Sequence, residues 1–307
     1  MKLRLGIKTD PIEYRYSFRW LFELMEELGV KNIQLGSFFE MYLLPDSYFL
    51  RLRRMAEDHG LRFAGCFTAH RELGGFFQSE PAYHKVAYDC FSRYLEIGAL
   101  LGAESVGSNP GAVMRDEMES KAAGIERYCA AVESLSKKAA EIGLSAITVE
   151  PMSSLAEPPT TPEEITAMMR RFAAHREKDP SGRVPVLLCG DVSHGLVDAA
   201  GKLVHTHVEL LEMQLPWLWE FHFKNTDSRY SSTFGFGDGA PQGIVSLPEV
   251  RNILVKGEET LPRRDLVGYV EIGGPKLGRD YSDPLLRDQL VQSVKAIQNV
   301  FREDISE

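Results

Sequence analysis

The sequence predicts a single (β/α)8 barrel, an α/β fold in which eight parallel strands alternate with helices. Three observations predict this fold. Eight short apolar runs recur along the 307 residues, and segments with helical periodicity lie between them. Acidic and histidine side chains stand at the carboxyl ends of several of these runs, where the functional residues of barrels gather. The position of these acidic and histidine side chains favours a closed barrel over a doubly wound open sheet. The alternation of strands and helices alone would fit either fold.

The predicted strands are short runs of β-branched and other apolar residues bounded by polar loops. Their alternation with helices covers the whole chain, so we expect one domain over residues 1–307, an ordinary length for a barrel. In chain order the eight runs are Leu3–Lys8, Asn32–Gly36, Arg62–Phe67, Ser105–Gly107, Ser145–Glu150, Val186–Asp191, Leu218–Phe223 and Leu266–Glu271.

Three segments show a one-sided apolar stripe with the period of an α-helix. The last of them follows Ser282-Asp283-Pro284, a helix start signal, and is predicted to close the ring. The apolar positions are Phe18, Leu21, Phe22, Met25 and Leu28 in the first segment, Ile125, Tyr128, Cys129, Val132 and Leu135 in the second, and Leu286, Leu290, Val294, Ile297 and Phe301 in the third.

Between the seventh and eighth strands, residues 224–264 are rich in Gly, Ser and Thr and are predicted to form one long βα loop. A loop of about forty residues in a compact domain is usually functional, for example as a lid or part of a substrate pocket. We therefore expect this segment to border the functional site.

Composition excludes several classes of function. With 44% hydrophobic and 26% charged residues the chain resembles an ordinary globular protein, and its net charge of −9 disfavours nucleic acid as a partner. The four cysteines form no CxxC pair, so neither a zinc knuckle nor a disulfide framework is indicated. No signal peptide or membrane-spanning stretch is recognisable. We expect a cytoplasmic protein without membrane or nucleic-acid partners, forming a dimer or tetramer.

Four successive strands end in a potential metal ligand: Glu150, Asp191, His222 and Glu271. A lone acid or histidine at a strand end commonly caps a helix or pairs with a neighbouring cation. Four on adjacent barrel strands converge on one mouth, where the carboxylates repel one another unless a cation neutralises them. Oxygen ligands with a single nitrogen suit Mn²⁺, Mg²⁺ or Co²⁺ better than a thiolate-binding metal.

With the order Glu, Asp-x-x-His, His, Glu at the ends of strands five to eight, the chain resembles the xylose-isomerase-like barrels, and among them the ketose 3-epimerases that act on tagatose or psicose. The resemblance covers the whole chain as an eightfold pattern, and its specific part is 145–281. It implies that Glu150, Asp191, His222 and Glu271 hold one divalent ion, Mn²⁺, Mg²⁺ or Co²⁺ with Zn²⁺ as a further option. It also implies that His194 contacts the substrate.

The chemistry implied by this resemblance is C3 epimerisation of a ketose or ketose phosphate. A metal chelated by a carbonyl oxygen and the adjacent hydroxyl lowers the cost of removing the neighbouring C–H proton, because it stabilises the resulting enediolate. One glutamate takes the proton from one face and the other returns it from the opposite face. Glu150 and Glu271 are the predicted pair.

Further residues are predicted to bind the substrate. Lys224 and Arg229 follow His222, and the resemblance implies that Arg229 is the substrate-binding arginine that the epimerases place several residues beyond this histidine. Lys276 and Arg279 follow a glycine pair after Glu271 and indicate a phosphate site, although a tight turn with two surface cations explains them equally well. His70, beyond strand three, is a candidate hydroxyl-binding residue, as are Lys8 and Asn109.

Other functions stay open on the sequence. An aldose–ketose sugar or sugar-phosphate isomerase shifts the same enediolate by one carbon and is the second hypothesis. A keto-polyol dehydratase begins with the same proton abstraction. An abasic-site endonuclease needs more histidine ligands and a basic groove, and a non-catalytic sugar sensor needs no complete set of ligands.

Overall fold

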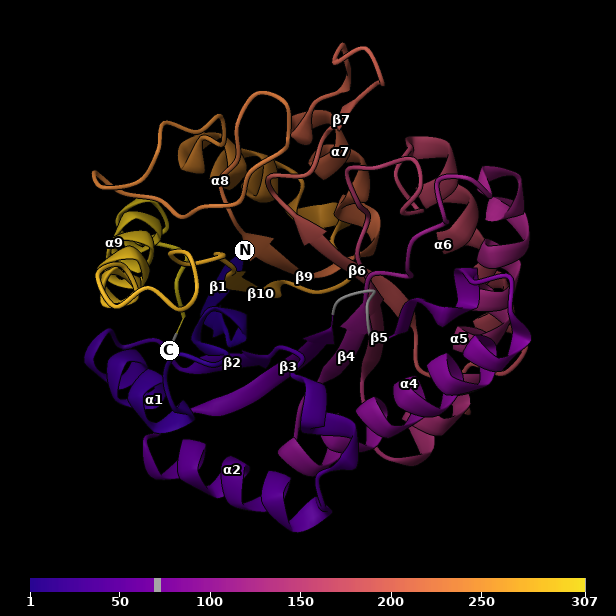
Figure 1. The fold of residues 1–307 in the computed structure, drawn as a ribbon, viewed down its shortest axis with the longest axis horizontal. Coiled ribbons are helices and arrows are strands. Elements are labelled where there is room, and N and C mark those ends of the chain that lie inside the picture. The colour runs from indigo at the N-terminus through magenta and orange to yellow at the C-terminus, as the bar shows by residue number, and fades with distance from the viewer. Residues whose placement is uncertain (69–72, 307) are drawn as a thin grey trace. The chain divides into compact units, whose positions relative to one another are not determined.

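A computed structural model describes residues 1–68 and 73–306 of the chain. The barrel strands are β1 (Lys2–Lys8), β2 (Asn32–Leu35), β3 (Arg62–Thr68), β4 (Ser105–Ser108), β5 (Ala146–Val149), β6 (Val186–Asp191), β9 (Leu218–Phe223) and β10 (Asp265–Val270). They close in the order β1-β10-β9-β6-β5-β4-β3-β2 (Figure 1). The predicted (β/α)8 fold is confirmed, and each predicted strand is found with its ends displaced by at most one residue.

Eight α-helices of the described residues lie between and after these strands. They are α1 (Phe18–Glu27), α2 (Asp46–Asp58), α4 (Pro81–Leu101), α5 (Lys121–Glu141), α6 (Pro162–Glu177), α7 (His207–Gln214), α8 (Leu247–Lys256) and α9 (Leu285–Val300). The same residues form six 3-10 turns: η1 (Asp10–Ile12), η2 (Phe39–Leu43), η3 (Gly74–Phe77), η4 (Met118–Ser120), η5 (Leu215–Trp217) and η6 (Glu258–Thr260). In the part of the chain that the structure describes, no helix combines the length and apolarity needed to cross a membrane.

Most apolar positions predicted for these helices are buried, whereas Phe18, Leu28 and Ile125 are half-buried. In α9 the buried positions include Leu286, Leu290, Val294 and Ile297, which recur every three or four residues and therefore share one face. Helix α1 begins after Ser17, whose hydroxyl accepts a hydrogen bond from the amide of Trp20 and so satisfies one free amide of the first turn.

The chain divides into two compact units. Unit 1 comprises Met1–Leu35, Arg54–Arg62 and Gly190–Glu307, and unit 2 comprises Gly36–Arg53 and Phe63–Cys189. The core of unit 1 includes an aromatic row in which Phe223 meets Phe221 and Phe301 at ring-centroid distances of 4.7 and 5.4 Å. In unit 2, Phe76 meets Tyr128 at 5.9 Å. A single domain over residues 1–307 stays a prediction.

The segment predicted as one long loop, residues 224–264, contains helix α8 and turn η6. The prediction was wrong in this respect. Helix α8 starts at a favourable sequence, because Ser246 accepts a hydrogen bond from the amide of Glu249 and Pro248 occupies the first turn. The helix buries Leu247, Val250, Ile253 and Leu254. The βα loop therefore ends at Ser246, and the regular alternation of strand and helix extends through this part of the chain.

A two-stranded antiparallel sheet of β7 (Leu196–Val197) and β8 (Leu203–His205) follows β6 and was not predicted. His205 ends β8, and His207 is buried at the first position of α7, where its amide donates to the hydroxyl of Tyr230. Thr206 between them caps α7, which is why strand changes to helix at this point.

Candidate metal centre

Three side chains of unit 1 meet at the carboxyl ends of their strands. Asp191 is the last residue of β6, His222 the fifth of the six residues of β9, and Glu271 directly follows β10. Backbone hydrogen bonds join these ends, since the amide of Glu271 donates to the carbonyl of Phe223 and that of Val192 to the carbonyl of His222. The side chains of Asp191 and His222 are fully buried, and that of Glu271 is 16% exposed.

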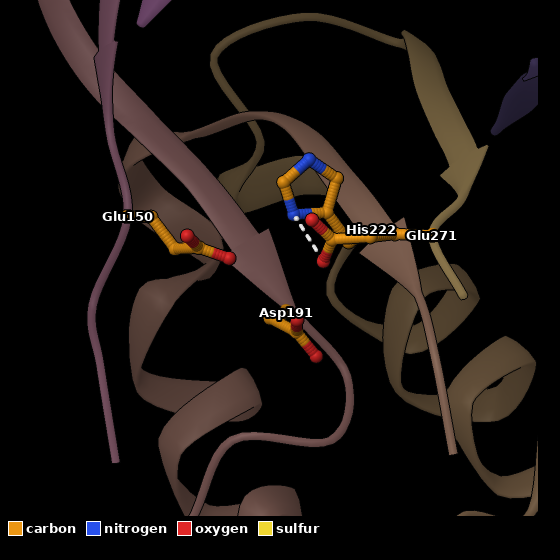
Figure 2. A group of neighbouring side chains, drawn as sticks. All are labelled: Glu150, Asp191, His222 and Glu271. Carbon is orange, nitrogen blue, oxygen red and sulfur yellow. Dashed lines mark ion pairs between the residues drawn. The ribbon is translucent and has the colours of Figure 1, made fainter. Parts of the chain in front are cut away.

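Asp191, His222 and Glu271 each offer a ligand atom, and these atoms lie within 4.8 Å of one another. Two ligands of one cation with metal–oxygen distances of about 2.0–2.4 Å can be separated by at most about 4–5 Å. Two carboxylates and one imidazole at this spacing therefore fit a single divalent ion. Figure 2 draws the three side chains together with Glu150 and marks the ion pair between His222 Nδ1 and Glu271 Oε2, which are 3.4 Å apart.

Two buried lysines neutralise these carboxylates. Lys224 Nζ lies 2.6 Å from Asp191 Oδ2 and 3.1 Å from Glu271 Oε2. Lys8 Nζ lies 2.5 Å from Glu271 Oε1 and 2.8 Å from Asp10 Oδ2. Because a buried carboxylate without a counter-charge is strongly destabilising, these contacts keep the cluster compatible with a folded interior.

The same charges shift the pKa values of the two carboxyl groups. Burial alone would raise the pKa of Glu271, but His222 when it is protonated, together with the positive charges of Lys224 and Lys8, outweighs burial and holds the pKa well below its ordinary value. Burial alone would also raise the pKa of Asp191, but His194 and Lys224 outweigh burial, so the pKa of Asp191 lies below its ordinary value. Both groups are therefore anions at neutral pH, as metal binding requires.

We expect the unfolding free energy of the metal-free protein to decrease as the pH falls below about 4.5. The pKa values of Asp191 and Glu271 in the folded state lie below their ordinary values of 3.8 and 4.5, so the unfolded chain takes up protons first. The stabilisation is fully present above the unfolded pKa values and is lost as the pH falls through the folded ones. Urea unfolding in a chelator, from about pH 7 to about pH 3, measures this loss.

The matched variant for this measurement is Glu271→Gln, which removes one of the two titrating groups. Its unfolding free energy should decrease less steeply with falling pH than that of the wild type. Equal slopes for the two proteins would show that Glu271 is not held in its charged form by the fold.

Glu150 belongs to unit 2 and directly follows β5. It is 4% exposed, and its amide donates to the carbonyl of Ser108 on the neighbouring strand β4. Pro151 follows it, and a proline has no amide hydrogen with which to continue the ladder. The local sequence thus fixes Glu150 at the end of its strand, as predicted.

The residues predicted to bind substrate lie in different surroundings. His194 is 9% exposed, and its Nε2 lies 3.4 Å from Asp191 Oδ2 and 3.3 Å from Lys224 Nζ, so it belongs to the buried cluster together with Lys224. Arg229, Lys276 and Arg279 are exposed. His70 lies outside the described residues. A substrate-binding role for each of them stays a prediction.

The glycine pair after Glu271 is held in place by Arg15. The guanidinium of Arg15 donates to the carbonyls of Pro11, Gly273 and Pro275. It also lies 3.4 Å from the carboxylate of Asp283. The loop that would carry a phosphate site is thus tied to the loop that follows β1.

The sequence analysis missed Gln34, although the strand that carries it shows one signal. Gln34 is a polar side chain between Ile33 and Leu35 in the short strand β2, and it is fully buried. Its Oε1 lies 2.8 Å from His222 Nε2. A polar residue inside a buried parallel strand commonly has a specific partner, and here the partner is on another strand.

Solved structures with the same fold cover almost the whole chain. A xylose isomerase domain protein from Planctomyces limnophilus superposes with a TM-score of 0.68 at 12% identity, covering 99% of each chain. D-psicose 3-epimerase with D-tagatose from Clostridium cellulolyticum H10 gives 0.68 at 13%, covering 99% of this chain and 98% of that one. The IolI protein with a bound zinc atom gives 0.69 at 18%, covering both chains completely.

These similarities show that the chain has the fold of the xylose-isomerase-like barrels. No protein-family model matches the sequence, and a search of curated proteins finds no match.

Proposed function

We propose that the protein is a divalent-metal-dependent epimerase that inverts C3 of a ketose or ketose phosphate. The observation that carries this proposal is the buried cluster of Asp191, His222 and Glu271, whose ligand atoms lie within 4.8 Å of one another. A fold similar to that of a D-psicose 3-epimerase supports it. A buried set of anions at the carboxyl ends of barrel strands is also where such folds place their chemistry.

Glu150 is proposed as the fourth ligand, with Asp191, His222 and Glu271. A bound divalent cation supplies a Lewis acid that stabilises negative charge on the carbonyl and hydroxyl oxygens of the substrate. The oxygen-rich set suits Mn²⁺, Mg²⁺ or Co²⁺, and the zinc atom bound to the IolI protein adds Zn²⁺ to the ions worth testing.

Proton transfer is assigned to Glu150 and Glu271. Epimerisation requires one group to remove the proton at C3 and a second to return a proton to the opposite face, and two carboxyl groups can exchange these roles in the reverse reaction. The low pKa of Glu271 ensures that it enters as the anion. Its uptake of a proton requires the contacts with Lys8 and Lys224 to loosen, so the position of Lys224 controls its strength as a base.

His194 and Lys224 are proposed to hold the substrate. Both are buried, both are in contact with Asp191, and both carry nitrogen groups that can bond to hydroxyl oxygens. Arg229, Lys276, Arg279 and His70 are proposed as outer contacts, with Lys276 and Arg279 acting only on a phosphorylated substrate.

Hydrogen exchange tests this proposal. The metal-loaded protein is incubated in D₂O with a panel of ketoses and ketose phosphates, and NMR follows both loss of C–H signals and new isomers. Deuterium at C3 together with an epimer is the expected result. Protein treated with a chelator is the control and should give no label.

Two outcomes would overturn the proposal in different ways. Label at C1 or C2 with an aldose product would make the protein an aldose–ketose isomerase. No exchange with any ketose, in protein shown to contain metal, would exclude both reactions and direct attention to dehydration.

A further inference from the structure

The imidazole of His222 is fully buried between two oxygen atoms. Its Nε2 lies 2.8 Å from Gln34 Oε1, and its Nδ1 lies 3.4 Å from Glu271 Oε2. A neutral imidazole carries one proton, so one nitrogen donates and the other presents a lone pair. Which nitrogen carries the proton determines which of them can bind a metal ion.

We infer that Gln34 is a positioning residue that fixes His222 as its Nε2–H tautomer and so reserves Nδ1 for a cation; this inference rests on the proposed metal site. An amide oxygen has no proton to donate, so a hydrogen bond with Gln34 Oε1 requires the proton on His222 Nε2. The lone pair of Nδ1 is then on the side of the ring that faces Glu271, whose Oε2 lies 3.4 Å away.

The contact between His222 Nδ1 and Glu271 bears on this assignment. In the Nε2–H tautomer, the lone pair of Nδ1 faces a carboxylate oxygen 3.4 Å away, and two acceptors facing each other repel. A cation bound by both atoms removes that repulsion. A second proton on the ring would instead turn this contact into an ion pair, so the protonation state of Nδ1 distinguishes a metal ligand from a charged histidine paired with Glu271.

Gln34 is well placed to hold the ring in one orientation. Its backbone pairs with Lys8 between β1 and β2, and its carbonyl accepts a hydrogen bond from the amide of Thr9. Its side chain is fully buried, and its Nε2 has no hydrogen-bond partner among the described residues. A buried amide nitrogen without a partner is destabilising, so packing alone does not account for a glutamine here. The hydrogen bond between its oxygen and His222 accounts for it.

The tautomer can be read directly by NMR of protein with ¹⁵N-labelled histidine, in the metal-free state at neutral pH. Eight histidines are present, and the signals of His222 are identified by their loss in His222→Asn. Long-range proton–nitrogen correlations should show a protonated Nε2 and an unprotonated Nδ1. In Gln34→Leu this preference should be lost, whereas Gln34→Glu keeps an acceptor oxygen and should keep Nε2 protonated.

Metal affinity provides the second measurement. Loss of a residue that orients a metal-binding histidine typically weakens metal binding by about 10–100-fold, and we expect this for Gln34→Leu in calorimetric titration with Mn²⁺ and Co²⁺. Gln214→Leu is the matched control, because Gln214 is also a buried glutamine of unit 1 whose amide group has an atom without a hydrogen-bond partner among the described residues. It should bind metal as the wild type does.

The outcomes separate this inference from the proposed function. A protonated Nδ1 or a doubly protonated ring in the wild type would overturn the inference, as would unchanged metal affinity in Gln34→Leu while the wild type binds metal. If the wild type binds no divalent ion, the proposed function fails, although the NMR measurement still reports the tautomer. Should Gln34→Leu not fold, Gln34→Glu still decides, since loss of Nε2 protonation in that variant contradicts the role assigned to the oxygen.

Discussion

Glu271→Gln is expected to lower the rate of C3 epimerisation by at least about 10²–10⁴-fold, the usual contribution of a general acid or base. An amide cannot take up the proton and is a poor metal ligand, so the substitution removes two roles at once. It also leaves Lys8 and Lys224 without the carboxylate they contact. Initial rates with the best ketose from the exchange experiment measure the effect, and Glu150→Gln should cause a loss of similar size.

Glu212→Gln is the matched control for both variants, because Glu212 is an exposed glutamate on α7. Its rate should equal that of the wild type. Circular dichroism and thermal unfolding establish that each variant is folded. A Glu271→Gln protein that is folded, binds metal and retains a rate within a few-fold of the wild type would exclude Glu271 as a proton-transfer residue.

Removal of divalent metal is expected to abolish activity, and addition of Mn²⁺, Mg²⁺ or Co²⁺ is expected to restore it. The reason is that Asp191, His222 and Glu271 provide negative charge and a nitrogen ligand but no Lewis acid of their own. Metal should also stabilise the fold, by about 2.7 kcal/mol at a free concentration 100 times the Kd. Activity and thermal unfolding are measured after chelation and again after each ion is added.

Asp191→Asn distinguishes metal bound at this cluster from metal bound elsewhere. The variant should show a smaller rise in Tm on addition of metal than the wild type does. Full activity after exhaustive chelation, with metal content confirmed by elemental analysis to be negligible, would rule out metal-dependent catalysis by this protein.

The strands could be predicted because their apolar character is local. A buried parallel strand reads as a short apolar run, and β6 and β9 begin and end at the predicted residues. Helix α8 was missed because its ten residues are surrounded by a long segment rich in Gly, Ser and Thr. The β7–β8 pair was missed because strands of two and three residues leave too few positions for a period to be recognised.

The candidate site, like the fold, could be predicted only in part from the sequence. The positions of Asp191, His222 and Glu271 at the ends of strands could be predicted, since parallel strands all end at one edge of a sheet. Their partners could not be predicted, because Gln34 is 188 residues from His222 and Lys8 is 263 residues from Glu271. Such contacts depend on the register between strands and on side-chain direction, which no local pattern encodes.

Lys224 contacts the carboxylates of both Asp191 and Glu271, so its ammonium group competes with any divalent cation for them. Asp191 Oδ2 and Glu271 Oε2, the oxygens that Lys224 contacts, belong to the carboxylates proposed to bind metal, so a divalent ion must compete with a cation that is tethered to the chain. The observed metal affinity is then the intrinsic affinity reduced by the fraction of molecules in which the lysine has withdrawn. A substrate that draws the ammonium group away raises the affinity for metal, and by reciprocity bound metal strengthens the binding of that substrate. Under the proposed function, Lys224 therefore couples the occupancy of metal and substrate, and it neutralises the carboxylates before either is bound.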